Sequence, residues 1–201
     1  MIGFDTCTTA IASYTFSPKV STGNHVTFQS PSIQEHNDNT STANPYAWSF
    51  AGFADGSVAL FDERVSSHGG RVHFSKEHKA WVVSAHLRAD IPEVITGTLS
   101  GSMKFWDLRT MRSFKTIEVH KSPLTALAVH NYAPIIATGS HAQFIKFITM
   151  NGEQLGMIRY HDGFLGQRIG PVSCLAFHPV KLLLAAGATD NIVSIYAATD
   201  A

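Results

Sequence analysis

One spacing recurs along this chain and limits what it can fold into. Glycine ends a short apolar run four times, at intervals of 45, 42 and 48 residues: Gly52, Gly97, Gly139 and Gly187. Nine residues beyond each glycine stands a bulky side chain: Phe61, Trp106, Ile148 and Tyr196. Between the glycine and the bulky residue the chain turns and then alternates apolar and polar residues, which is typical of two paired strands. The sequence therefore predicts an all-β protein built from repeated strand units.

The best-formed unit lies at residues 96–107, where a glycine turn leads into an alternating run that ends in Trp106-Asp107. Aligning the chain on this unit gives four units, at about 46–77, 78–119, 120–160 and 161–201. Each of the last three begins with a histidine: His78, His120 and His161. Self-similarity at a period of 40–45 residues is a strong signal of a repeat architecture.

The first 45 residues do not follow the repeat. They contain one possible strand near residues 10–16 and then a poorly patterned, polar stretch that is predicted to be loop. The first unit consequently lacks an innermost strand directly before Tyr46, and the last unit lacks an outermost strand. The strand near 10–16 is the obvious candidate to complete the last unit. The preferred expectation is that the completing strand lies upstream of Met1 in a longer protein.

Composition narrows the range of partners. The 15 basic and 15 acidic residues cancel to a net charge of zero. Nucleic acids are bound largely through charge neutralisation, so we expect no nucleic-acid partner. No apolar run is long enough to span a bilayer, so we expect no direct membrane insertion. The two cysteines, Cys7 and Cys174, predict no disulfide and a reducing, cytoplasmic location, with Cys174 in the core.

The sequence does not support catalytic or metal-binding chemistry. The two cysteines lie 167 positions apart, so the 11 histidines have no closely spaced cysteine pair with which to form a typical zinc site. Because His78, His120 and His161 recur once per unit, we interpret them as structural. The sequence has no nucleophile-elbow motif and no phosphate-binding glycine loop. We therefore expect a protein that is not an enzyme and that holds neither metal nor cofactor.

One connection departs from the repeat. Between His161 and the strand that begins at Val172, the chain is seven residues longer than at the two equivalent places before it. This insert combines apolar and charged side chains with three glycines, a composition suited to an adaptable contact surface. The candidate protein-binding residues are Tyr160, Asp162, Phe164, Leu165, Gln167 and Arg168. In the alternative interpretation, Phe164 and Leu165 fold back onto a neighbouring sheet.

The repeat resembles the WD40 family, whose units close on a Trp-Asp pair. The resemblance implies a WD40-type β-propeller with about four blades visible, forming the C-terminal part of a seven-bladed ring. It also implies that the histidine of each blade hydrogen-bonds to a Ser or Thr on the second strand and to the Trp on the third. The expected structural repeat positions are Gly52, Phe61, His78, Gly97, Trp106, Asp107, His120, Gly139, His161, Gly187 and Tyr196.

A narrower resemblance begins in the insert. Residues 160–168 read Tyr-x-Asp-Gly-Phe-x-Gly-Gln-Arg, and residues 173–179 read Ser-Cys-Leu-Ala-Phe-His-Pro. Together they resemble the last blade of the Raptor family, and the similarity extends over about residues 45–198. It implies a non-catalytic scaffold that supports assembly of target-of-rapamycin (TOR) complex 1. The implied partners are the TOR kinase and other subunits of the complex.

The same resemblance implies a cytoplasmic location, peripheral at the lysosome or vacuole surface through the complex. The alternative is a generic WD40 adaptor, such as a ubiquitin-ligase substrate receptor. Such an adaptor would need a basic or aromatic ring at equivalent loop positions of successive blades, and the sequence shows none.

Overall fold

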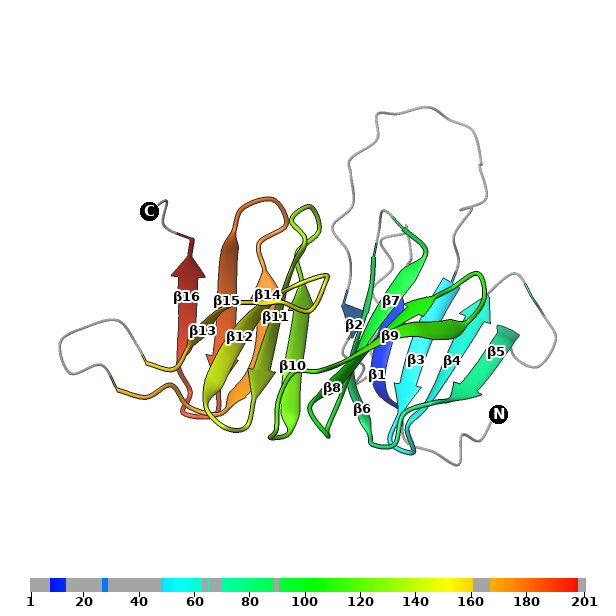
Figure 1. The fold of residues 1–201 in the computed structure, drawn as a ribbon, viewed down its shortest axis with the longest axis horizontal. Helices are drawn as coiled ribbons and strands as arrows, with labels where there is room; N and C mark the ends of the chain where they lie inside the picture. Colours follow the sequence, from blue (N-terminus) through cyan, green and yellow to red (C-terminus); the bar gives the residue numbers. More distant parts are fainter. Residues whose placement is uncertain are drawn as a thin grey trace.

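In the computed structural model of this chain, residues 8–13, 27–28, 48–62, 65, 70–88, 91–160 and 167–198 are described. These residues form four sheets that stand side by side in a row (Figure 1). The strands pair antiparallel, except that β2 runs parallel to β1. The described architecture is that of a WD40 β-propeller, as the glycine repeat predicts.

Each sheet is one blade. In the last three blades the strands follow the chain from the innermost position outwards, whereas in the first blade the second strand of the chain lies at the sheet edge, beside the first strand. The first blade contains β1 (Thr8–Ser13), β2 (Thr27–Phe28), β3 (Trp48–Phe53), β4 (Ser57–Asp62) and β5 (Arg71–Lys76). The second contains β6 (Val82–Leu87), β7 (Glu93–Thr98), β8 (Ser102–Asp107) and β9 (Arg112–Glu118). The third contains β10 (Leu124–Val129), β11 (Ile135–Ser140), β12 (Phe144–Thr149) and β13 (Gln154–Ile158). The fourth contains β14 (Val172–Phe177), β15 (Leu183–Ala188) and β16 (Val193–Ala197).

The strand β1 corrects one expectation from the sequence. It pairs antiparallel with β3 and therefore takes the place beside β3 that the sequence left without a strand, while the two-residue β2 pairs with its other edge. The strand expected near residues 10–16 thus lies at 8–13 and completes the first blade, whereas the sequence made it a candidate for the last. Its pairing partner lies far along the chain, beyond a polar stretch that no local pattern could bridge.

Three of the four recurring glycines lie against the innermost strand of the next blade. The contacts join Gly52 to Val82, Gly97 to Leu124, and Gly139 to Val172. In each case the first residue of the next innermost strand rests on the glycine. A Cβ atom on Gly139 would lie only 2.5 Å from Cγ1 of Val172. A larger residue would push the blades apart, so the glycine spacing in the sequence reflects the contacts between blades.

Apolar side chains fill the space between consecutive blades. Phe50 and Trp106 lie in the core between the first and second blades, where each is at most 1% exposed. Ile95 and Ile136 lie in the next core, and Leu175 and Leu184 in the last. These cores make the row of blades rigid and hold the loops at both ends of the strands in fixed relative positions.

The outward face of the fourth blade is exposed. Val193 and Ile195 of β16 are 72% and 73% exposed, whereas Ile145 and Phe147 at the equivalent positions of the third blade pack against the fourth. Cys174 is also exposed, so its predicted place in the core is wrong. The repeat pattern predicts core wherever another blade follows, and among the described residues no sheet covers this face. Cys7 lies outside the described residues.

Candidate functional site

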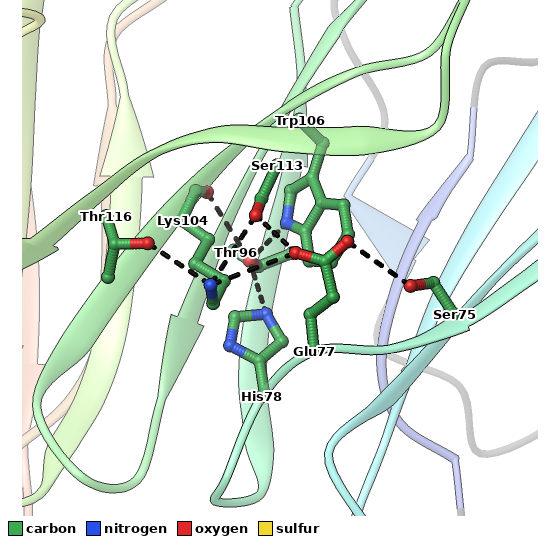
Figure 2. A network of polar contacts seen from close by, with 8 residues as sticks. All are labelled: Ser75, Glu77, His78, Thr96, Lys104, Trp106, Ser113 and Thr116. Carbon is green, nitrogen blue, oxygen red and sulfur yellow. Dashed lines mark hydrogen bonds and ion pairs between the residues drawn. The ribbon is translucent and has the colours of Figure 1, made fainter.

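A buried polar network lies in the second blade, where the histidine repeat indicated one. His78 Nε2 lies 2.9 Å from Thr96 Oγ1, and Trp106 Nε1 donates to the same oxygen at 2.8 Å (Figure 2). The Thr96 hydroxyl in turn donates to the carbonyl oxygen of Lys104 at 3.4 Å. Since the hydroxyl hydrogen is used in this way, the Thr96 oxygen accepts from both rings, and His78 carries its hydrogen on Nε2.

The His78 ring is held neutral. It is 4% exposed, and among the described residues its Nδ1 atom has no hydrogen-bond partner. Burial and, to a smaller extent, the Lys104 ammonium lower the pKa of His78 to about 4, while Glu77 opposes both effects. Protonation of this ring would destabilise the folded chain, because the imidazolium charge would be buried and poorly solvated. The ring therefore has a structural role in the blade.

Glu77 connects this network to β5, the outermost strand of the first blade. Its carboxylate accepts hydrogen bonds from Ser75 of β5 and from Ser113 of β9, so it joins two blades (Figure 2). Lys104 Nζ lies 3.9 Å from the same carboxylate and donates to Thr116 at 3.1 Å. The carboxylate side chain is 33% exposed and the lysine side chain 16%, so solvent screens their attraction in part.

The third blade has half of this network. His120 Nε2 lies 2.9 Å from Thr138 Oγ1, but Ile148 stands where the second blade has its tryptophan. Burial and, to a smaller extent, Lys146 lower the pKa of His120 to about 4. The Lys146 ammonium donates to the carbonyl oxygen of Val119 at 2.7 Å, where the second blade has a carboxylate. Within the described ranges no three His, Cys, Asp or Glu side chains are placed to hold a metal ion.

The structure describes both ends of the insert in the last connection. Tyr160 and Arg168 face each other in an antiparallel β-bridge, which brings together two of the predicted binding residues. Tyr160 is 58% exposed, and Gln167 is exposed beside the bridge. Arg168 Nη2 donates to the carbonyl oxygen of Ala142 in the turn between β11 and β12, at 3.2 Å. The remaining candidates lie outside the described residues, as does one repeat histidine: Asp162, Phe164, Leu165 and His161.

One residue of this connection was missed by the sequence argument. Ile169 is 3% exposed and lies in the apolar core between the third and fourth blades. Its N–H donates to the carbonyl oxygen of Arg159 at 3.0 Å, so it fixes the insert to the strand before it. The sequence signal that could have identified this buried residue is an isoleucine at the position where the preceding connection has Lys121. The insert is thus anchored at its base while Tyr160, Gln167 and Arg168 remain accessible.

Comparison with known proteins agrees with this geometry. The family model for the WD domain, G-beta repeat, matches residues 163–196. The raptor homolog of Dictyostelium discoideum is 47% identical over 73% of this chain and 10% of its own length. Regulatory-associated protein of TOR 1 from Arabidopsis thaliana is 49% identical over 73% of the chain and 11% of its own. This is a Raptor-type WD40 region.

Two further comparisons extend the relationship. Subunit mip1 of target of rapamycin complex 1 from Schizosaccharomyces pombe is 36% identical over 74% of the Raptor-type chain and 12% of its own length. The crystal structure of Chaetomium thermophilum Raptor superposes with a TM-score of 0.67 at 29% identity, covering 76% of this chain and 15% of that one. The chain therefore spans about a tenth of the length of the curated relatives that it matches. Among the described residues, no helix has the length and apolar character to cross a membrane.

Proposed function

We propose that this chain is a non-catalytic scaffold region that supports assembly of TOR complex 1. The observation that carries the proposal is its 47–49% identity to Raptor proteins over 73% of the chain. The partners are the TOR kinase and the other subunits of the complex. The site of action is cytoplasmic, at the lysosome or vacuole surface, and is reached through the complex.

The physical features of the chain suit a scaffold. Its blades are joined by continuous apolar cores, so loops from different blades keep fixed relative positions. The polar network around His78 and Thr96 is buried and its hydrogen bonds lie within the blade, so its groups are not exposed to a substrate. The generic adaptor alternative has less support, because the insert after Tyr160 resembles that of Raptor proteins and is not typical of other WD40 proteins.

The test is affinity purification of the tagged protein from its own cells, followed by quantification of co-purified proteins. We expect the TOR kinase and other complex subunits to be recovered in amounts comparable with the tagged protein. Recovery of only unrelated assemblies, in extracts where the TOR kinase is intact, would contradict the proposal.

A paired variant tests the predicted contact role of the insert. The double substitution Tyr160→Ala and Arg168→Ala removes exposed side chains and leaves the buried anchor Ile169 in place. If the insert contacts the complex, recovery of at least one subunit should fall by about tenfold, as expected for contact residues near the centre of an interface. The matched control is Tyr132→Ala, an aromatic residue that is 71% exposed at the opposite end of the strands. Equal recovery with both variants would leave the scaffold proposal intact and reject the insert as its contact.

A further inference from the structure

Gly156, in the outermost strand of the third blade, is a glycine that the fold does not require. Its backbone does not adopt the left-handed conformation that favours glycine, whereas those of Gly101 and Gly152 do. A Cβ atom at position 156 would meet no other atom within 4 Å, whereas one on Gly139 would collide with the next blade. Neither backbone conformation nor packing therefore explains the absence of a side chain here.

The two preceding blades carry a side chain at this position. The equivalent pairs between outermost and third strands are Gly156 with Phe147, Lys115 with Phe105, and His73 with Leu60. In the second blade the Lys115 ammonium lies 5.5 Å from the centre of the Phe105 ring. It also donates to the carbonyl oxygen of Met150 in the third blade, at 3.0 Å. Lys115 thus covers the phenyl ring and joins two consecutive blades.

A cavity of about 300 Å³ opens between the third and fourth blades, where no such side chain covers the ring. Phe147 and Gly156 line it from the third blade, and Phe177 and Tyr196 line it from the fourth. It reaches the surface beside Leu155, which is 57% exposed. Ligand sites in proteins occupy about 300–1,000 Å³, so the cavity is large enough for a small molecule.

The lining of the cavity determines which molecules it suits. Among the described residues that line it, none is charged, and Tyr196 has the only polar side chain. A charged ligand would lose its hydration without gaining an ionic partner, which is costly. Three aromatic rings line the cavity, and aromatic rings pack favourably on one another in stacked or edge-to-face arrangements.

We propose that this cavity, named here the Gly156 cavity, binds a small uncharged aromatic molecule with one hydrogen-bonding group. The ligand ring covers Phe147 as Lys115 covers Phe105 in the preceding blade, and its polar group bonds to the hydroxyl of Tyr196. A bound ligand thereby joins the third and fourth blades. The site uses no side chain of the insert at residues 160–170, so its failure would leave the proposed scaffold function standing.

The experiment is a titration of the complete chain with naphthol, followed by two-dimensional NMR of the backbone amides. We expect saturable shifts at Gly156 and at the residues that line the cavity, and a rise in the thermal unfolding midpoint with naphthol concentration. The anion naphthoate has a similar ring system and should bind at least about tenfold more weakly, because its charge must be desolvated. Absence of saturable shifts, or equal affinity for naphthoate, would overturn the proposal.

The variant that tests the site is Gly156→Lys, which supplies the side chain found at Lys115. Its ammonium would have the carbonyl oxygen of Ala198 as acceptor, since Ala198 follows the third strand of its blade directly, as Met150 does. We expect an unfolding midpoint at least equal to that of the parent chain and affinity for naphthol lower by about tenfold or more. Gly156→Val fills part of the cavity without a new charge and should also weaken binding. Undiminished binding by either folded variant would reject the assignment.

Two substitutions in β16 separate the cavity from the exposed face of the same strand. Tyr196→Phe keeps the ring and removes the hydroxyl, so naphthol should bind about threefold to tenfold more weakly, as expected for one lost hydrogen bond. Ile195→Ser removes an apolar side chain that is 73% exposed on the other face of the strand, and it should leave affinity unchanged. Loss of binding in Ile195→Ser alone would place the ligand on the outward face of the fourth blade and contradict the proposal.

Discussion

The second and third blades hold the same buried pair in different surroundings. His78 bonds to Thr96 and His120 bonds to Thr138, each at 2.9 Å. In the second blade Trp106 adds a second donor to the threonine oxygen, and its ring lies 5.5 Å from the imidazole. In the third blade the aliphatic Ile148 occupies that position, and the threonine oxygen has one donor fewer.

An aromatic ring covers the imidazole in both blades, but it comes from different positions. The ring of Phe144, at the start of β12, lies 5.2 Å from that of His120. The second blade has Ser102 at the start of its third strand. The blades therefore share a histidine–threonine bond and an aromatic cover, while the tryptophan is one of two ways to supply that cover. In the third blade another position therefore supplies the aromatic cover, while the hydrogen bond that the tryptophan donates is lost.

The largest loss of stability should come from removing Trp106, the aromatic ring that covers His78 in the second blade. Trp106 is fully buried, so Trp106→Ala should destabilise the chain by about 3–5 kcal/mol, through lost packing and a cavity. Phe144→Ala removes a half-buried ring and should cost about 1–2 kcal/mol. Urea unfolding followed by circular dichroism measures both changes. Equal costs would show that the two rings are equivalent supports, contrary to their burial.

Acid should act on both blades alike. The pKa values of His78 and His120 are lowered to about 4 in the folded chain, so the unfolded chain binds more protons below pH 6.5. Stability is therefore fully present above about pH 6.5 and falls as the pH drops to about 4, by on the order of 3 kcal/mol for each ring. Unfolding free energies measured across this window should show the loss.

Substitution of either histidine tests this equivalence. His78→Asn and His120→Asn should each remove a similar part of the slope between pH 6.5 and 4. Half-buried His86, whose pKa is lowered to about 4 by burial and by Arg88, contributes to what remains. A slope that is unchanged in both variants would place the acid sensitivity elsewhere.

Substitution of the threonines should cost the two blades different amounts of stability. Thr96→Val leaves two buried donors unpaired, one on each ring, whereas Thr138→Val leaves one. Since an unsatisfied buried donor costs about 1–3 kcal/mol, the first variant should lose roughly twice as much stability as the second. Thermal or urea unfolding of the two variants, prepared side by side, gives the ratio. A ratio near one would mean that the tryptophan N–H contributes nothing measurable to the second blade.

Much of this fold follows from the sequence, and the exceptions have physical reasons. The glycines and the histidines His78 and His120 recur with a local period, so alignment of the sequence alone assigns each of them to a unit. The pairing of β1 with β3 was not predicted, because the two strands are distant in sequence and no local pattern reports which strands pair. Cys174 was misplaced because alternation marks the two faces of a strand without telling which of them a neighbour covers.

The candidate site was predictable to a smaller extent. The unusual length of the last connection identified Tyr160 and Arg168, which the structure brings together. The buried anchor at Ile169 and the aromatic cover by Phe144 depend on contacts between elements, and spacing along the chain does not report these.

The smallest loss of stability should follow substitution of Glu77, a residue with no counterpart carboxylate in the third blade. Its carboxylate is one-third exposed and opposes the pKa depression of His78, whereas the third blade places a carbonyl oxygen near Lys146. Glu77→Gln should cost less than about 1 kcal/mol, since partly exposed ion pairs contribute little. It should lower the pKa of His78 further and leave that of His120 unchanged, because only the first imidazole feels the lost charge. Two-dimensional NMR titration of the histidine rings measures both values, and a rise in the pKa of His78 would contradict the role assigned to this carboxylate.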